Sequence, residues 1–406
     1  MQVKPISCYR PTPEAAAEFA SLPYDVYDRA EARAYVAEHP RSFLAIDRPE
    51  TQFDPDYDMY APEVYKRGAK LLDKRITDRT LLPDAGPCYF IWSMTHDGHT
   101  QTGIVAACSV DEYLDGTIRR HENTRPEKEQ DRVRHIEALS AQTGPIFLAY
   151  RDQPVLDTLV EAACAGTPIY HFVDEQGVEQ KVWRVARPEA TAAFEAMFEH
   201  IPCAYIADGH HRAASAVRVC KERREQGKPE GGSNEFLAVL FPANQLTILP
   251  YNRVVSDRAG LSPEELLSAI RSAGFTTEPS SEPVVPTHHG ETGMYVDGSW
   301  WRLVIDPSLV PEDAVASLDA SIIQDRILGP ILGITDPTRD QRISFVGGVR
   351  GTDELERRAG AEGVAFSMHA TSVDELLAVA DNGQLMPPKS TWFEPKLLSG
   401  LFVRQI

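Results

Sequence analysis

A single glycine separates an apolar run from a polar helix start in CAYIADGHHRAASA, residues 203–216. Residues 203–207 have the length and composition of a short buried strand, and residues 210–226 follow a helical pattern that ends at Gly227. The stretch therefore predicts a strand that passes directly into a helix. This restricts the chain to folds in which helices pack on a sheet.

Five residues lie at this predicted strand-to-helix elbow, namely Asp208, Gly209, His210, His211 and Arg212. Glycine lets the backbone approach a ligand closely, and the free N–H groups of a helix start favour an anion. Arginine forks onto phosphate oxygens, and histidine donates hydrogen bonds to them or orients a neighbouring group. The alternative is structural, with Asp208 as a helix cap and the histidines on the surface. We interpret the elbow as an anion site.

A second polar constellation lies upstream in TIRRHENTRPEKEQDRVRH, residues 117–135. Glu122, with His121 and Thr124 beside it, precedes a helix expected over residues 127–141. A carboxylate held there is suited to accept a proton from a hydroxyl group. The alternative is a solvated loop, followed by a helix with charge pairs one turn apart.

The pattern along the chain predicts an α/β (α+β) protein with three regions. They are an N-terminal α/β region over residues 1–112, a core over 113–255 that carries the elbow, and a C-terminal α/β region over 256–406. A hairpin is expected over 88–110, around the turn THDGHT. The phosphate-loop, dinucleotide-fingerprint, zinc-protease and nucleophile-elbow motifs are absent.

Composition limits the partners and the compartment. The formal net charge of -19 opposes a long nucleic-acid or anionic-membrane surface, so no nucleic-acid partner and no membrane association are expected. The N-terminal residues lack a signal-peptide core, and the six cysteines are scattered without a CxxC pair. We expect a soluble cytoplasmic protein with reduced thiols.

The DGHHR elbow with its alanine-rich helix resembles the active-site motif of the free L-serine kinase family, within the ParB and sulfiredoxin-like superfamily. The segment at His121 and Glu122 resembles the His-Glu segment of that family. The chain also resembles long, largely uncharacterised proteins that carry this kinase-like core. This resemblance lies in five segments: SLPYDVYD (21–28), HENTRPEKEQDRVR (121–134), DGHHR (208–212), LPYNRVV (249–255) and MPPKSTWFEPKLLSGL (386–401). This resemblance covers most of the chain and implies a ParB/sulfiredoxin-like kinase core.

The resemblance implies a role for each matched residue. Glu122 would be the general base for the serine hydroxyl, and residues 209–212 would bind the donor phosphates. Asp208 would accept a hydrogen bond there or help to hold Mg²⁺. The donor stays open between ATP, ADP and pyrophosphate, because this chain has an additional N-terminal region and a different tail from the short kinases.

The tail contains the polar, basic residues Lys389, Ser390, Thr391 and Lys396 in an otherwise acidic chain. They are candidates for substrate or phosphate contacts, as are His121 and Thr124. The alternative is a C-terminal strand docked by aromatic residues, with solvated lysines. For SLPYDVYD, a rigid polar turn at Tyr24 that faces the cleft competes with a helix-entry turn capped by Asp28.

The function expected from these features is that of a small-molecule kinase that phosphorylates free L-serine with Mg²⁺. The alternative is a non-catalytic regulator that senses a nucleotide or phosphate. The expected partners are L-serine and the phosphate donor, and a homo-oligomer is possible.

Overall fold

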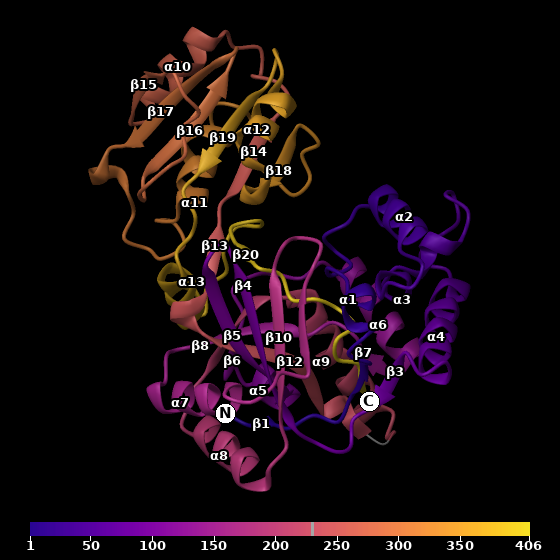
Figure 1. Ribbon diagram of the computed structural model, residues 1–406. Coiled ribbons are helices and arrows are strands. Elements are labelled where there is room, and N and C mark those ends of the chain that lie inside the picture. Colours follow the sequence, from indigo (N-terminus) through magenta and orange to yellow (C-terminus); the bar gives the residue numbers. More distant parts are fainter. Residues whose placement is uncertain (229–230) are drawn as a thin grey trace. The chain divides into compact units, whose positions relative to one another are not determined.

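The computed structural model describes residues 1–228 and 231–406, which form two compact units (Figure 1). The first unit contains residues 1–120, 124–246 and 395–406, and the second contains residues 121–123 and 247–394. Each unit has its own sheet and its own apolar core. Helices cover the sheet in both, which confirms the predicted mixed α/β class.

The first unit is built on a mixed sheet with the strand order β6-β11-β8-β12-β5-β4-β10-β9, to which β1 adds by pairing with β5. Most neighbours are antiparallel, but β11 pairs in parallel with β6, and β12 pairs in parallel with β8. The bounds are β1 Val3–Lys4, β4 Tyr89–His96, β5 His99–Ser109, β6 Ile118–Arg119, β8 Ile146–Tyr150, β9 Tyr170–Val173, β10 Glu179–Val185, β11 Ala204–Asp208 and β12 Glu235–Pro242.

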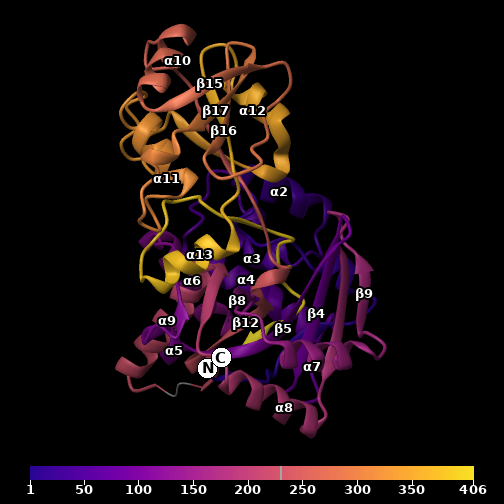
Figure 2. The same cartoon turned by 90° about the vertical axis from the view of Figure 1, so that its left-hand side faces the viewer.

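The helices of the first unit divide between two cores. Side chains of α6, α7, α8 and α9 share one apolar cluster with one face of the sheet, and both views show α7 and α8 side by side (Figures 1 and 2). A second cluster joins the N-terminal helices to α6 and to the chain's last residues. The bounds are α1 Ala16–Phe19, α2 Arg29–Glu38, α3 Leu44–Asp47, α4 Pro62–Thr77, α5 Val110–Leu114, α6 Pro126–Leu139, α7 Pro154–Cys164, α8 Pro188–Glu199 and α9 His210–Glu225.

The predicted hairpin over 88–110 is confirmed as β4 and β5. Its turn uses Asp97 (φ 49°) and Gly98 (φ 78°), and two consecutive positive φ values are what a tight hairpin turn requires. These strands pair with β10 and β12, so the predicted regions 1–112 and 113–255 contribute strands to the same sheet.

Residues 395–406 return to the first unit. The Phe402 ring lies 4.9 Å from the Phe90 ring and 5.8 Å from the Trp92 ring, between ring centroids, on the side of the hairpin away from α7 and α8. The short strand β21 (Arg404–Gln405) pairs with β7 (Ala141–Gln142). A tail that is remote in sequence thus closes part of the first unit's core. The two-stranded pair β2 (Tyr9–Pro11) and β3 (Leu81–Pro83) completes this unit.

The second unit contains an antiparallel sheet with the order β15-β17-β16-β19-β14-β18. One apolar cluster joins it to α10 and α11, and another joins it to α12. A separate ribbon pairs β13 with β20. The bounds are α10 Pro263–Ser272, α11 Asp319–Ile323, α12 Gly351–Ala359, α13 Val373–Asp381, β13 Thr247–Leu249, β14 Tyr251–Val255, β15 Phe275–Ser280, β16 Glu291–Val296, β17 Ser299–Ile305, β18 Ile343–Gly347, β19 Val364–Met368 and β20 Trp392–Glu394.

Two global expectations can be compared with the described residues. Across residues 1–228 and 231–406, no helix is long and apolar enough to cross a membrane. The six cysteines are all free thiols, five of them buried and Cys164 half-buried.

Candidate functional site

The predicted elbow is present where β11 ends at Asp208 and α9 begins at His210. Gly209 is the N-cap residue, with φ 92° and ψ 30°, a left-handed conformation that favours glycine. The N-cap residue is thus Gly209 and not Asp208, so the N-cap role considered for Asp208 is not realised. The first backbone N–H groups of a helix have no partner inside the helix, and such groups favour an anion.

Arg212 lies under the elbow and is almost fully buried, with 8% of its surface exposed. One terminal nitrogen (Nη1) donates to the Pro145 carbonyl oxygen at 2.5 Å, and the other (Nη2) donates to Asp208 Oδ2 at 3.0 Å. Burial alone would lower the pKa of Arg212, but Asp208 and other nearby carboxylates more than offset this and raise it. Arg212 therefore stays charged and fixes the shape of the elbow.

Asp208 joins the elbow to the returning tail. Its Oδ1 lies 3.8 Å from Nζ of Lys396, while its Oδ2 accepts the hydrogen bond from Arg212. Lys396 is largely buried, with 11% of its side chain exposed. The structure thus brings this tail lysine, predicted from its charge alone, to the carboxylate of the DGHHR motif. Two cations and one carboxylate meet at the helix start.

The histidines and Thr124 connect the elbow to α6. His210 is buried. Nε2 of the partly exposed His211 accepts a hydrogen bond from the backbone N–H of Arg125 at 3.0 Å. This bond requires an unprotonated Nε2, so the neutral His211 ring carries its proton on Nδ1. Thr124 Oγ1 donates to Glu129 Oε2 at 3.2 Å, in the first turn of α6.

His121 and Glu122 belong to the second unit. His121 is buried, with 1% exposed, and its carbonyl oxygen accepts a hydrogen bond from the Met386 N–H at 2.7 Å. Glu122 is partly exposed. The general-base role of Glu122 therefore stays a prediction, as does the substrate role of His121.

Three other residues of the tail also belong to the second unit, namely Lys389, Ser390 and Thr391. Lys396, in the same tail segment, belongs to the first unit. Lys389 has a positive φ of 61°, its carbonyl oxygen accepts from Arg253 Nη2 at 3.3 Å, and its ammonium lies 5.2 Å from the Tyr251 ring centroid. Thr371 Oγ1 donates to the Ser390 carbonyl oxygen at 3.1 Å. The following residues form β20, so the docked strand considered for the tail is present, and the contacts of this polar turn with a ligand stay a prediction.

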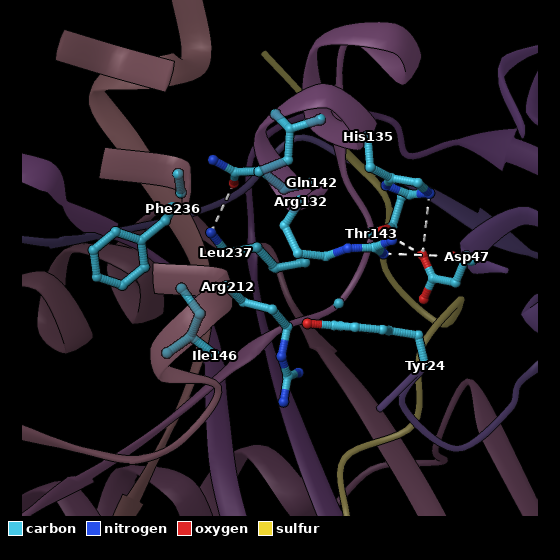
Figure 3. A pocket seen from close by; sticks show the side chains of 13 residues that line it. Tyr24, Asp47, Arg132, His135, Gln142, Thr143, Ile146, Arg212, Phe236 and Leu237 are labelled. Atoms are coloured by element: carbon cyan, nitrogen blue, oxygen red, sulfur yellow. Dashed lines mark hydrogen bonds and ion pairs between the residues drawn. The ribbon is translucent and has the colours of Figure 1, made fainter. Parts of the chain in front are cut away.

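A cavity of about 30 Å³ lies directly beside the elbow within the first unit (Figure 3). It exceeds the roughly 10–15 Å³ that one buried water needs. Polar side chains line one part of it and apolar side chains the other. The lining is Tyr24, Asp47, Arg132, His135, Ile136, Gln142, Thr143, Gly144, Ile146, Arg212, Ala216, Phe236 and Leu237.

The Tyr24 side chain forms one wall of this cavity. Arg132 lies over its ring, with the guanidinium carbon 4.0 Å from the ring centroid. The next turn ends in a capping box, in which the Asp28 side chain accepts from the Glu31 N–H at 2.8 Å. Both roles considered for SLPYDVYD therefore occur together, a Tyr24 that faces a cavity and an Asp28 that caps α2.

Sequence reasoning missed the cavity residues Asp47, Arg132, His135 and Thr143. Thr143 Oγ1 donates to Asp47 Oδ1 at 2.8 Å, and His135 Nε2 lies 3.1 Å from the Ile46 carbonyl oxygen. Asp47 ends the short helix α3, Arg132 and His135 lie on the buried face of α6, and Thr143 follows the short strand β7. A polar residue at a core-facing helical position was the available signal, but a single sequence does not distinguish it from a solvated one.

The fold and the site together define the class of protein: an α/β chain with a strand-to-helix elbow beside a polar cavity. The chain belongs to the family described as "Protein of unknown function (DUF1015)", whose model matches residues 3–321. A search of curated proteins finds no match.

The chain is also similar to several solved structures at low identity. One is SbnI with a C-terminal truncation from Staphylococcus aureus, at 16% identity, covering 74% of this chain and 87% of that chain with a TM-score of 0.41. Another is a free serine kinase mutant in complex with AMP, at 11% identity, 71% and 86% coverage and a TM-score of 0.37. A conserved hypothetical protein from Pyrococcus furiosus is similar at 11% identity, 75% and 95% coverage and a TM-score of 0.36.

Proposed function

We propose that the protein is a small-molecule kinase that transfers a phosphoryl group to the hydroxyl of free L-serine and forms O-phosphoserine. The observation that supports this is the start of α9 at Gly209, an N-cap residue in the left-handed conformation, with Lys396 and Arg212 beside it. Helix starts of this kind bind phosphate through backbone N–H groups. Phosphoryl transfer suits such a site, because its catalysis consists mainly of positioning and charge neutralisation.

The donor phosphates bind residues 209–212 in this proposal. The backbone N–H groups at the helix start contact phosphate oxygens, His210 and His211 donate further hydrogen bonds, and Lys396 supplies positive charge. Arg212 acts mainly by holding the elbow, because both of its terminal nitrogens already have protein partners. The donor is ATP, ADP or pyrophosphate, and each offers the same terminal phosphate group.

Mg²⁺ is the metal expected with such a donor, and its chemistry is to neutralise charge on the phosphate oxygens. Asp208 is the carboxylate at the elbow that would hold it. Arg212 and Lys396 already neutralise Asp208, so they compete with Mg²⁺ for it, and Asp208 would be at most one ligand in a shell made mainly of water and phosphate oxygens.

Glu122 takes the proton of the serine hydroxyl in this proposal. The serine oxygen then forms a bond to the terminal phosphorus, and the bond between that phosphorus and the leaving phosphate oxygen breaks. The remaining part of the donor leaves as ADP, AMP or inorganic phosphate. His121, Thr124, Lys389, Ser390 and Thr391 are proposed to contact the substrates. The general base and the elbow must then act on one serine molecule.

The test is the formation of phosphoserine from L-serine and Mg²⁺ with ATP, ADP or pyrophosphate, each compared with Glu122→Gln. We expect product with one donor and none from the variant, because glutamine cannot accept the hydroxyl proton. Product at an unchanged rate from Glu122→Gln would remove Glu122 from this role.

Measurements of donor binding distinguish the role of Glu122 from that of the elbow. Glu122→Gln should bind the donor with nearly unchanged affinity, whereas Arg212→Ala should weaken binding at least tenfold because the elbow loses its support. Equal loss of binding in both variants would contradict the assignment. If the protein binds the donor but forms no product with L-serine, the phosphate-sensing regulator or another small hydroxylated acceptor takes the place of the serine kinase.

A further inference from the structure

Arg212, whose side chain lines the cavity beside the elbow, has a buried nitrogen that lacks a partner in the described chain. Within the described residues, Nε of Arg212 has no hydrogen-bond partner, and Arg212 is more than nine-tenths buried. A buried donor left unpaired destabilises the folded state. Because the Arg212 side chain lines the cavity, a ligand there could recover this cost.

A second donor faces the same end of the cavity. Figure 3 shows the Tyr24 side chain lying below Arg132 with its hydroxyl directed toward the Arg212 side chain. None of the hydrogen bonds between described residues uses this hydroxyl. Burial raises the pKa of Tyr24, so the hydroxyl keeps its proton and remains a donor. Donors without acceptors at one end favour a group with exposed oxygens, such as a carboxylate.

The opposite end of the cavity presents a carboxylate. Asp47 is buried, with 2% exposed, and its Oδ1 accepts from Thr143 while lying 3.7 Å from His135 Nε2. Burial and the neighbouring Arg132 lower the pKa of His135, which weakens its ion pairing with Asp47. In Figure 3, the Tyr24 ring spans the distance between Asp47 and Arg212.

The charges around the cavity argue against a simple anion. Arg132 is paired with Asp131 through two contacts of 2.8 and 2.7 Å, and Arg212 is paired with Asp208 at 3.0 Å. Lys396 also lies 3.8 Å from Asp208, so with Asp47 three carboxylates are balanced by three cations. A lone anion would upset this balance, whereas a zwitterion adds no net charge and places its ammonium near Asp47 and its carboxylate near the unpaired donors.

We propose that this cavity binds the α-ammonium and α-carboxylate groups of a small amino acid, with Asp47 at the ammonium and with Tyr24 and Arg212 at the carboxylate. This inference rests on the proposed function, because it states where the amino-acid acceptor is held. The apolar wall formed by Ile146, Phe236 and Leu237 leaves room only for a small side chain. Arg212 connects the cavity to the elbow, so head-group recognition and phosphate binding share one side chain.

The first test compares ligands on the unaltered full-length protein by isothermal titration calorimetry. L-Serine should bind, whereas serinol, which lacks the carboxylate, and L-glycerate, which lacks the ammonium, should bind at least tenfold more weakly. Equal affinity for all three, or no binding of any amino acid, would overturn the proposal. This comparison needs no variant and so does not depend on how a variant folds.

The second test removes single groups. Tyr24→Phe keeps the ring against Arg132 and removes only the hydroxyl, and it should weaken L-serine binding about tenfold while leaving pyrophosphate binding unchanged. Asp47→Asn should weaken L-serine binding at least tenfold and reduce the preference for L-serine over L-glycerate. Tyr27→Phe is the matched control, because the Tyr27 ring packs in a tilted arrangement against Tyr35 outside the cavity, and it should bind like the unaltered protein.

The same variants separate this inference from the proposed function. If L-serine binding depends on Tyr24 and Asp47 but no donor gives phosphoserine, the cavity proposal stands and the kinase proposal fails. If phosphoserine forms and both variants keep the KM for L-serine of the unaltered protein, the kinase proposal stands and the cavity proposal fails.

Discussion

At the scale of single residues, Gly209 and Arg212 depend on each other. A Cβ atom at Gly209 would lie 3.0 Å from Nε and 3.1 Å from Cζ of Arg212. Gly144 approaches the same side chain from the other side, where a Cβ would lie 3.3 Å from Cδ of Arg212. The arginine therefore runs between two glycines, and the motif needs glycine both for the turn and for the room that it gives Arg212.

Replacing Gly209 tests this dependence. Gly209→Ala should lower the free energy of unfolding by about 2–4 kcal/mol, because a positive φ is strained for alanine and the Cβ displaces Arg212. It should also weaken pyrophosphate binding, measured by calorimetry beside urea unfolding.

Gly227→Ala is the matched control, because Gly227 has a positive φ of 62° and no atom of the described residues comes within 4 Å of the added Cβ. It should cost only about 1–2 kcal/mol and leave pyrophosphate binding intact. Equal losses of stability in Gly209→Ala and Gly227→Ala would show that backbone strain alone, without the contact to Arg212, explains the effect at Gly209.

At the scale of elements, α6 and α9 hold the elbow. Ser215 Oγ on α9 donates to the Glu129 carbonyl oxygen on α6 at 3.1 Å, and Arg218 Nη2 donates to Gln130 Oε1 at 2.7 Å. These contacts and the hydrogen bond between Arg125 and His211 join the starts of both helices. The start of α9 is thus tied to a neighbouring helix, while its N-cap residue, Gly209, has no side chain of its own.

Some other helices are capped by side chains of their own first turn. The cap of α10 allows the contribution of such a contact to stability to be measured. Ser262 Oγ accepts from the Glu265 N–H at 3.3 Å, and the Glu265 side chain accepts in return from the Ser262 N–H at 2.9 Å. Ser262→Ala should lower the free energy of unfolding of the second unit by about 1 kcal/mol.

Ser272→Ala in the last turn of the same helix is the control. Its hydroxyl only returns to the Ser268 carbonyl oxygen, and alanine has the higher helix propensity, so the change should be within about 0.5 kcal/mol of zero. A loss as large as that of Ser262→Ala in urea unfolding would argue against the capping explanation.

At the scale of the whole molecule, ion pairs connect distant segments in a chain of net charge -19. Asp84 accepts from Nε of Arg10 at 2.6 Å and from Nε of Arg184 at 2.7 Å, which joins β2 to β10. Its side chain is 1% exposed. Burial alone would raise the pKa of Asp84, but the two arginines more than offset this and lower it.

Acid should therefore weaken the first unit. Because the pKa of Asp84 is lower in the folded state than the roughly 3.9 of an unfolded chain, the unfolded state binds more protons in that interval. The stabilisation is present above about pH 5 and is lost as the pH falls through the folded pKa. Urea unfolding at pH 7, 5, 4 and 3 measures this decline.

Asp84→Asn tests whether this residue contributes to the decline. The variant should be about 2–3 kcal/mol less stable at pH 7, because two arginines lose their anion, and its stability should fall less between pH 5 and 3. A variant that declines as steeply as the unaltered protein would assign the acid sensitivity to other carboxylates.

The sequence by itself determined the local elements and the motif. The hairpin β4–β5, the helix α6 and the elbow at Gly209 all follow from short-range signals: alternation, a proline at the helix start, and glycine where φ must be positive. These features depend on neighbours within a few residues, so one chain is enough to predict them. The anion-binding interpretation of the elbow also came from the sequence, and it stays a proposal.

Only the tertiary structure decided which residues meet. It brought Lys396 to Asp208 across almost two hundred residues, assigned Glu122 and Lys389 to a different unit from the elbow, and assembled Tyr24, Asp47 and Arg212 around one cavity. The physical reason is that strand pairing and core packing select partners by shape and burial over long separations, and local propensity carries no record of those partners.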